Sequence, residues 1–117
     1  MATDAEPVRI SMCHCLACQR RTGSVFGAQA RFARRDVTVG GAAREFERRS
    51  DDGERRTYRF CPECGTTVYW TPEDLPEIIP VAIGTFRDPA FPPPRVSVYE
   101  SRRHAWVGLP PGAEHHG

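Results

Sequence analysis

Hydrophobic and polar residues alternate along much of this chain, and the alternation predicts short β-strands. In residues 24–32, Phe and Ala occupy every second position, with Gly, Gln and Arg between them. A period of two residues is typical of a strand with one buried face. The same alternation, or a run of β-branched and aromatic residues, predicts further strands at 36–39, 44–47, 56–60, 66–70, 77–83 and 95–99. Closely spaced short strands with turns between them indicate a mainly β domain with very little helix.

Turn residues and prolines refine this prediction. Gly40-Gly41 is a natural turn between two of the strands, and Ser-Asp-Asp-Gly at 50–53 is typical of a hairpin loop. Pro80 lies inside the predicted strand 77–83 and indicates an edge position or a bulge, because proline cannot donate a ladder hydrogen bond. We expect helix only as single turns at 15–21 and 71–74, the second opened by a Thr-Pro capping pattern.

The length and hydropathy of the chain fit one domain. At 117 residues and 39% hydrophobic content, residues 1–117 can form a single core, with flexible ends expected at 1–7 and 110–117. No apolar run approaches the roughly 20 residues that span a bilayer, and the polar start does not resemble a signal peptide. Five cysteines without an export signal favour a reducing cytoplasm. We therefore expect no membrane partner.

The basic residues are all arginines, yet the overall charge is close to balanced. The chain has 16 basic residues, none of them lysine, and a formal net charge of +1. Basic and acidic residues alternate, as in the segment 44–48, which is typical of a solvated surface and gives no indication of a nucleic-acid partner. The planar guanidinium can still bind a carboxylate through two parallel hydrogen bonds.

All five cysteines lie in two clusters whose spacing suits a metal better than disulfides. Cys13, Cys15 and Cys18 place three thiols within six residues, which would hold one zinc ion and leave its fourth position for a substrate. Cys61 and Cys64 form a Cys-Pro-x-Cys-Gly turn, in which two thiols can face one metal. On spacing alone, a second arrangement is equally possible: Cys15, Cys18, Cys61 and Cys64 would form a closed four-thiolate site, with Cys13 spare.

Four motifs resemble the glutathione-dependent formaldehyde-activating enzyme family, which includes centromere protein V. They are CHCLACQRRTGSVF at 13–26, FCPECG at 60–65, GTFRDP at 84–89 and SRRHAWV at 101–107. The resemblance implies a compact zinc-bearing β fold, similar to methionine sulfoxide reductase B and the Rab exchange chaperones.

The resemblance also implies that the two clusters have different roles. Cys13, Cys15 and Cys18 would hold an exchangeable, catalytic zinc, and Cys61 and Cys64 would belong to a structural zinc. In the family, a further C-x-C near the N-terminus completes the structural site, whereas residues 1–12 of this sequence contain no cysteine. Three explanations remain open: the sequence begins inside the family domain, the structural site is lost, or the five thiols share metal differently.

Residues that follow the first cluster are candidates for substrate binding. The side chains could contact the carboxylates and peptide groups of a glutathione-like ligand, although surface and turn roles are the simpler alternatives for each. These candidates are Arg20, Arg21, Thr22 and Ser24.

Histidines and tryptophans carry weaker signals. We expect His14 to point away from a metal that its neighbours bind, and His104 to be a packed, hydrogen-bonded histidine. Trp70 and Trp106 are expected in the core or at its rim.

The sequence thus favours a zinc-dependent carbon–sulfur lyase acting on a small thiol such as glutathione, or on its S-hydroxymethyl adduct. In this hypothesis, zinc at Cys13, Cys15 and Cys18 accepts the substrate thiolate, and proximity to the carbonyl carbon accelerates addition or elimination. The alternative is a non-enzymatic zinc module that binds a partner. A weaker third possibility, methionine sulfoxide reductase chemistry, would need a spare reactive Cys13.

Overall fold

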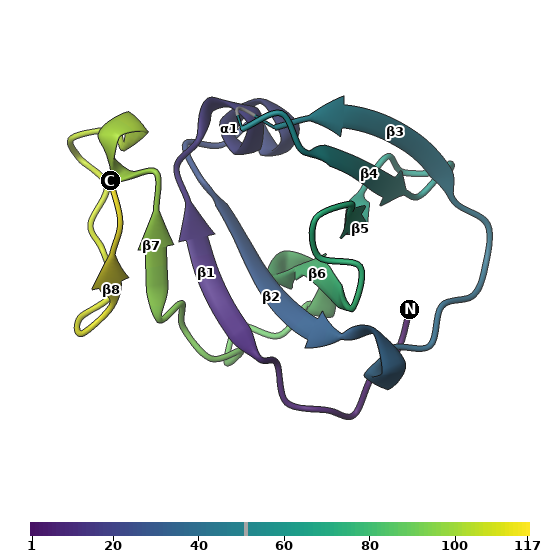
Figure 1. Ribbon diagram of the computed structural model, residues 1–117. Coiled ribbons are helices and arrows are strands. Elements are labelled where there is room, and N and C mark those ends of the chain that lie inside the picture. Colours follow the sequence, from purple (N-terminus) through teal and green to yellow (C-terminus); the bar gives the residue numbers. More distant parts are fainter. Residues whose placement is uncertain (51) are drawn as a thin grey trace.

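The computed structural model describes residues 1–50 and 52–117, and these form one curved sheet with a single α-helix (Figure 1). The elements are β1 (Arg9–Cys13), α1 (Leu16–Thr22), β2 (Gly27–Ala33), β3 (Arg44–Arg49), β4 (Arg55–Phe60), β5 (Thr67–Pro72), β6 (Ile78–Ala82), β7 (Val96–Val98) and β8 (Glu114–His115). Three short 3-10 helices lie at Arg34–Asp36, Ile83–Phe86 and Glu100–Arg102. The mainly β architecture expected from the sequence is confirmed. No helix in the described ranges is long and apolar enough to cross a membrane.

The strand order in the sheet is β3-β4-β5-β6-β2-β1-β7-β8. Neighbouring strands pair antiparallel from β3 to β1, whereas β7 runs parallel to β1 and β8 runs parallel to β7. The register places Cys13 of β1 beside Gly27 of β2 on one side and Val98 of β7 on the other. The sheet therefore carries the first thiol in its interior, supported by a strand from the far end of the chain.

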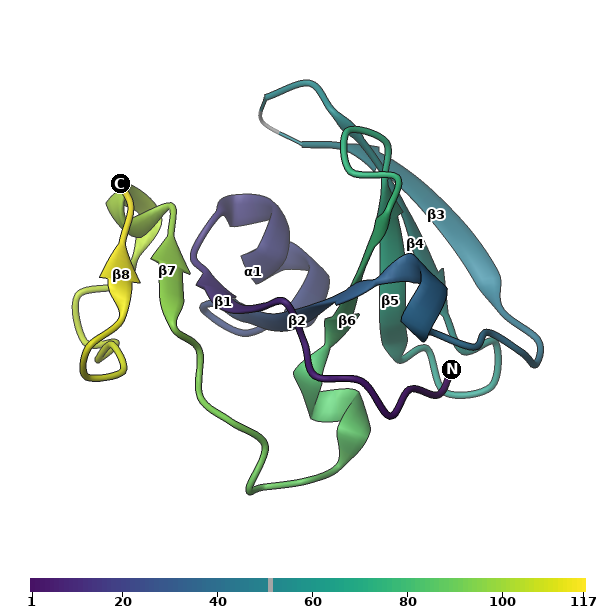
Figure 2. The same ribbon diagram turned by 60° about the horizontal axis from the view of Figure 1, so that its bottom comes forward.

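The two faces of the sheet separate apolar from polar side chains. One face carries the hydrophobic core, formed by Ile10, Ala30, Phe32, Ile79 and Val81. Because side chains alternate across a strand, the intervening residues of β1 and β2 line the opposite face. The bending of the sheet seen in Figure 2 turns this second face into a concavity, so the polar positions of the strands are partly enclosed.

Helix α1 follows β1 directly and closes one end of the concavity (Figures 1 and 2). Cys15 caps its first turn, and Gly23 ends it in the left-handed conformation with φ 69°, which glycine adopts without steric cost. The Nη1 atom of Arg48 in β3 donates to the carbonyl oxygen of Ala17 at 2.9 Å, which ties the helix to the opposite end of the sheet.

Two predicted elements are wrong. The strand expected at 36–39 is replaced by a 3-10 helix that ends at Asp36 and by an isolated bridge between Ala2 and Thr38. This segment has no neighbouring strand that could extend the pairing. The helical turn expected at 71–74 is absent because β5 continues to Pro72, and Asp74 forms an ion pair with Arg56.

Of the two positions expected for Pro80, the edge is excluded, because β6 is an interior strand. Pro80 lies opposite Arg31 in the ladder with β2, and the ladder between β6 and β5 contains only the pair Tyr69–Val81. An interior strand tolerates this proline because the short ladder with β5 demands few donors.

The loop between β3 and β4 and the C-terminal segment complete the fold. Within the expected hairpin loop, Gly53 N–H donates to the carbonyl of Ser50, and the Ser50 hydroxyl bonds to Asp52; Asp51 lies outside the described residues. At the other end of the chain, Ala113 is buried and β8 extends the sheet beside β7.

Candidate metal centre and its pocket

The junction of β1 and α1 gathers the first three thiols. Cys13 is the last residue of β1, Cys15 adopts an extended conformation at the helix cap, and Cys18 lies one turn into α1. The Cys15 sulfur accepts a hydrogen bond from the backbone N–H of Cys18 at 3.3 Å, as a capping side chain does. This change from strand to helix turns the chain sharply enough for a C-x-C-x-x-C segment to point all its thiols at one spot.

The three sulfur atoms lie within 4.8 Å of one another, which places them to hold a metal ion. Hydrogen bonds from Cys13 and Cys18 lower the pKa of Cys15 to about 2, and the Cys13–Cys15 sulfur distance is 3.3 Å. Hydrogen bonds to Cys15 and Cys18 and then burial raise the pKa of Cys13. For Cys18, the bond to Cys13 lowers the pKa, but the bond to Cys15 and burial outweigh it and raise the pKa to about 11.

Without a metal, the cluster is therefore one thiolate held by two thiols. Three clustered thiolates repel one another, so two of them keep their protons until a cation can balance the charge. A donor set of three sulfurs fits a thiophilic metal ion.

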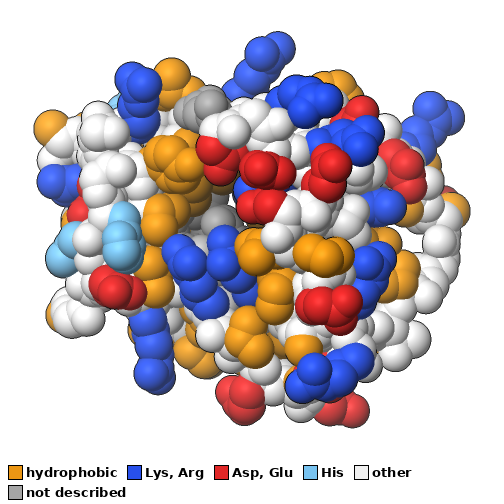
Figure 3. Space-filling model, in the orientation of Figure 1, with side chains coloured by type: hydrophobic (Ala, Val, Ile, Leu, Met, Phe, Trp, Pro, Cys, Tyr) orange, Lys and Arg blue, Asp and Glu red, His pale blue; other side chains and the backbone are white. Residues whose placement is uncertain are grey.

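A pocket opens directly beside the thiols, on the concave face of the sheet. It encloses about 780 Å³ of space, including its solvent-open mouth, and its walls come from α1 and seven of the eight strands. Figure 3 shows basic and hydrophobic side chains around a hollow on this side of the molecule, with acidic side chains on part of its rim. The residues that give the walls their character are Gln29, Arg31, Arg48, Arg56, Tyr58 and Trp70.

The pocket concentrates positive charge and contains an unpartnered polar atom. Burial and then the nearby Arg9 and Arg56 lower the pKa of Arg31, which shows that its cation is partly desolvated among like charges. Gln29 Oε1, in the pocket wall, is one of the described side-chain atoms that are buried without a hydrogen-bond partner. Because buried polar groups in proteins are nearly always paired, this oxygen is placed to accept from an N–H or O–H group of a ligand, while the arginines favour a ligand that also carries negative charge.

The substrate-binding candidates predicted from the sequence lie outside these walls. Arg20 and Ser24 are exposed, and the hydroxyl of Thr22 donates to the carbonyl of Cys18 at 2.9 Å near the end of α1. Arg21 stacks on Trp70 at 4.7 Å and, with Thr22, borders a separate, more open hollow. No observation tests their contact with substrate, so their role stays a prediction.

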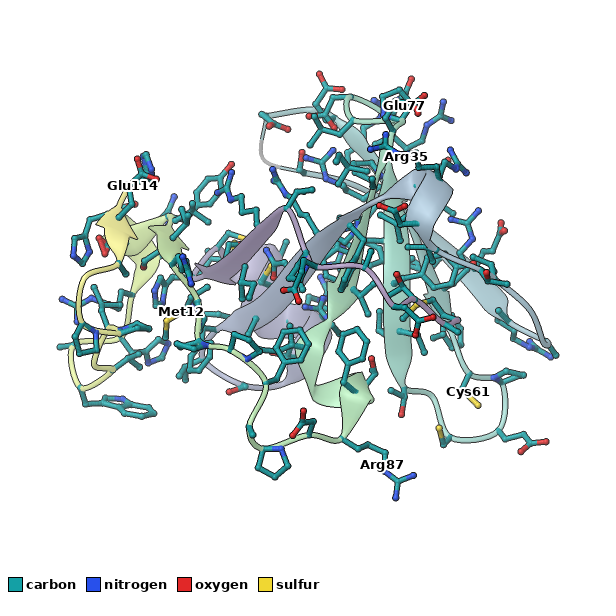
Figure 4. All side chains as sticks on the ribbon, turned by 90° about the horizontal axis from the view of Figure 1, so that it is seen from below. Met12, Arg35, Cys61, Glu77, Arg87 and Glu114 are labelled. Carbon is teal, nitrogen blue, oxygen red and sulfur yellow. The ribbon has the colours of Figure 1, made fainter. Side chains whose placement is uncertain are left out.

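The structure keeps the second thiol pair apart from the first cluster. Figure 4 places Cys61 well away from Met12, the neighbour of Cys13. Among the described residues, the only group of three or more donors close enough to share one ion is the first cluster. The merged site of Cys15, Cys18, Cys61 and Cys64 is therefore not formed. Hydrogen bonds from Thr66 and then Cys61 lower the pKa of Cys64.

His14 is fully buried between the ligands, and its Nε2 atom lies 3.1 Å from Ser97 Oγ, so its ring points toward β7 and away from the thiols. His104 is exposed, contrary to the packed position expected, although its Nε2 atom does bond to Gln19 Oε1 at 3.0 Å. Trp70 is buried as expected. Trp106 is 75% exposed, because it lies on the loop after the last 3-10 helix and not on a strand of the core.

Sequence reasoning missed the arginines of the pocket. Arg31, Arg48 and Arg56 occupy the polar positions of alternating strands, which normally face solvent. One signal was available: the alternation sets Phe46 and Arg48 on the same face of β3 as Tyr58 and Arg56 on β4, in directly paired positions. Aromatic and basic residues on the same face of two neighbouring strands are more typical of a ligand-binding surface than of a surface exposed to solvent.

Comparison with known proteins gives one family match. A family model described as glutathione-dependent formaldehyde-activating enzyme matches residues 1–102. No curated protein matches the chain.

Proposed function

Because the chain belongs to the glutathione-dependent formaldehyde-activating enzyme family, we propose that it is a zinc-dependent carbon–sulfur lyase acting on S-hydroxymethylglutathione or a similar thiol adduct. The observation that carries the proposal is the position of three converging thiols in the wall of an arginine-lined pocket. A closed structural site would have no use for such a pocket, whereas an enzyme needs its substrate beside the metal.

Zinc is the proposed ion because it favours thiolate ligands and a tetrahedral geometry, and three cysteines leave one position open. When bound, it would supply a Lewis-acidic position for a soft sulfur ligand. Cys13, Cys15 and Cys18 would hold it, and the guanidinium of Arg21, which stacks on Trp70, adds a positive charge near Cys18. The hydrogen bond to Cys13 and the charge of Arg21 lower the pKa of Cys18, but the bond to Cys15 and burial raise it further, so the cation itself must displace the thiol proton when it binds.

The arginines of the pocket would bind the substrate's carboxylates. Glutathione carries two carboxylates and an ammonium group around its thiol, so a basic pocket next to a sulfur-binding centre suits it. Arg31 and Arg48 are the main candidates, since Arg56 already pairs with Asp74 at 2.6 Å. Gln29, whose Oε1 atom is buried without a partner, would accept from an N–H group of the ligand. Anchoring both ends of the molecule would hold its sulfur close to the reacting carbon.

In the proposed reaction, addition forms a bond between the thiol sulfur and the carbon of formaldehyde, and elimination breaks it. The new alkoxide must take up one proton during addition. Among the described residues that line the pocket there is no carboxylate or imidazole. Burial raises the pKa of Tyr58, so this phenol remains a hydrogen-bond donor at neutral pH. Positioning, with water or Tyr58 as the donor, is therefore the main contribution of the protein.

All five cysteines are free in the structure. Reduced thiols persist in a reducing compartment, which supports cytoplasmic action.

The test combines metal binding with turnover. Zinc-loaded protein should accelerate exchange between formaldehyde, glutathione and their adduct, measured by exchange NMR, and glutathione should alter the absorption spectrum of the cobalt-substituted protein. Cys18→Ser should lose both effects, whereas Cys64→Ser, which leaves the first cluster intact, should keep them. A cobalt spectrum indifferent to glutathione would favour the non-enzymatic zinc module.

A further inference from the structure

Arg21, near the C-terminal end of α1, carries a guanidinium group whose buried side has no acceptor. Its Nε and Nη2 atoms are buried without a hydrogen-bond partner. Within the described part of the chain, no carboxylate forms an ion pair with it. Buried polar groups are nearly always paired, and a buried charge without a counter-charge costs free energy. The group therefore calls for an acceptor, and a negatively charged acceptor suits it best.

Trp70 holds this guanidinium beside the pocket. The Cζ atom of Arg21 lies 4.7 Å from the centre of the Trp70 ring, which is a stacking distance for a cation on an aromatic face. The indole is buried and lines the pocket next to the thiols, whereas Arg21 is absent from the described residues of that wall. The stack therefore keeps the positive charge close to the pocket without placing it in contact with a ligand there.

Gly27, the first residue of β2, provides the space in which Arg21 approaches the thiol cluster. A Cβ atom at this position would lie 2.8 Å from Arg21 Nη2, 3.3 Å from Cys18 Cβ and 3.6 Å from Cys18 Sγ. The first of these distances is shorter than a Cβ atom tolerates, so the present arrangement requires glycine. The unpartnered nitrogen and the Cys18 sulfur therefore flank the same point, on the strand that pairs with Cys13.

We propose that Arg21 is a positioning residue of the metal centre, whose buried N–H groups donate to the Cys18 sulfur in the metal-bound protein. A thiol is a weak acceptor, whereas a metal-bound cysteine is a thiolate and accepts strongly. Three thiolates around a divalent cation also leave one excess negative charge, which the guanidinium balances. Hydrogen bonds from outside the ligand set orient the ligands and tune the metal. This role rests on the metal centre of the proposed function, and not on the lyase reaction.

Zinc affinity, measured by competition with a chromophoric chelator, tests this role without turnover or substrate. Each variant is made in Cys64→Ser protein, the parent, so that the second thiol pair does not contribute to the titration. Arg21→Met keeps an apolar stem on Trp70 but removes the charge and the donors, so the affinity should fall about 10- to 100-fold. Arg21→Lys restores the charge without the planar fork and should recover part of the loss. Arg20→Met removes the same charge from an exposed position of α1 and should leave the affinity unchanged.

The cobalt-substituted protein gives a second measurement, which a purely structural role of Arg21 would not change. N–H donors withdraw electron density from a bound thiolate, so the sulfur-to-cobalt charge-transfer band should move to longer wavelength in Arg21→Met. Gly27→Ala keeps Arg21 but displaces its guanidinium, and should therefore also weaken zinc binding. In the Arg21→Met background, Gly27→Ala should add little, because no donor is left to displace.

The outcomes separate the role of Arg21 from the metal centre itself. Equal zinc affinities and equal cobalt bands in the parent and Arg21→Met would overturn the role and leave the centre in place. The same equality combined with weaker glutathione binding by Arg21→Met would assign the residue to substrate instead. A parent that binds neither zinc nor cobalt would overturn both. Urea unfolding of the metal-free proteins checks that every variant is folded.

Discussion

Replacing Arg31 with methionine should separate the binding role of this residue from its effect on stability. Arg31 of β2 lies directly opposite Arg9 of β1, and both burial and the charges of Arg9 and Arg56 lower its pKa. Like charges in directly opposed positions cost about 0.2–1 kcal/mol. Methionine keeps most of the apolar stem. The free energy of unfolding should therefore rise by about 0.2–1 kcal/mol in Arg31→Met.

Substrate binding should change in the opposite direction. A hydrogen bond to a charged group contributes about 1.5–3 kcal/mol, and each 1.4 kcal/mol is a factor of ten. If Arg31 binds a carboxylate of the substrate, kcat/KM should fall about 10- to 150-fold, mainly through KM. The assay is the exchange reaction at a series of glutathione concentrations, together with urea unfolding of the same preparations.

The exposed Arg35, on the 3-10 helix Arg34–Asp36, is the matched control. Arg35→Met removes the same charge from the chain without touching the pocket, so its kinetics should equal those of the wild type. A KM for Arg31→Met that stays within about twofold of the wild-type value would refute the assignment. A large loss of stability would refute the argument from like charges.

Three further predictions concern stability. Ser97→Ala leaves Nε2 of the fully buried His14 without a partner and should cost about 1–3 kcal/mol in urea unfolding. Phe32→Ala empties a core site that is 2% exposed and should cost about 3–5 kcal/mol by the same measurement. Metal-free protein should lose thermal stability as pH rises from 9.0 toward about 11, because folded Cys18 keeps a proton there that the unfolded chain releases. Cys15 does not offset this loss. Its pKa is lowered in the folded protein, so its contribution to stability is fully present above pH 9.0 and does not increase as the pH rises further.

An exposed serine provides the control for the stability predictions. Ser24→Ala, at an exposed serine, should change unfolding by no more than about 0.5 kcal/mol. An equally small effect of Ser97→Ala would mean that His14 does not depend on this hydrogen bond. If the melting temperature of metal-free protein keeps rising above pH 9.0, then Cys18 is not protonated in the folded state.

Strands with one apolar face could be located from the sequence, because their alternation is local information. β2, β3, β4, β5, β6 and β7 lie close to their predicted positions. β1 was not predicted, since its alternation covers only the five residues Arg9–Cys13 and four of them, on both faces, are buried. Parallel pairing with β7 makes it an interior strand, and nothing within a window around residue 10 contains that partner.

Part of the candidate site could likewise be predicted from local sequence, and part of it could not. The convergence of Cys13, Cys15 and Cys18 follows from spacing within six residues, so the sequence could anticipate it. The pocket arginines come from three different strands, and their convergence depends on the curvature of the whole sheet. For the same reason, sequence could not decide between a merged and a separate second thiol pair. That choice depends on where β4 ends relative to α1.

The parallel pairing of β1 with β7 has a consequence for how the protein matures. The buried contact between His14 and Ser97 joins residues 83 positions apart, and the Cys13 strand has no neighbour on that side until β7 exists. A ribosome releases the cysteine motif long before it completes β7. Contacts of such wide sequence separation also form slowly, because loop closure must precede them. The strand that carries Cys13 therefore gains its second neighbour, and His14 its buried partner, only after the last quarter of the chain has been synthesised.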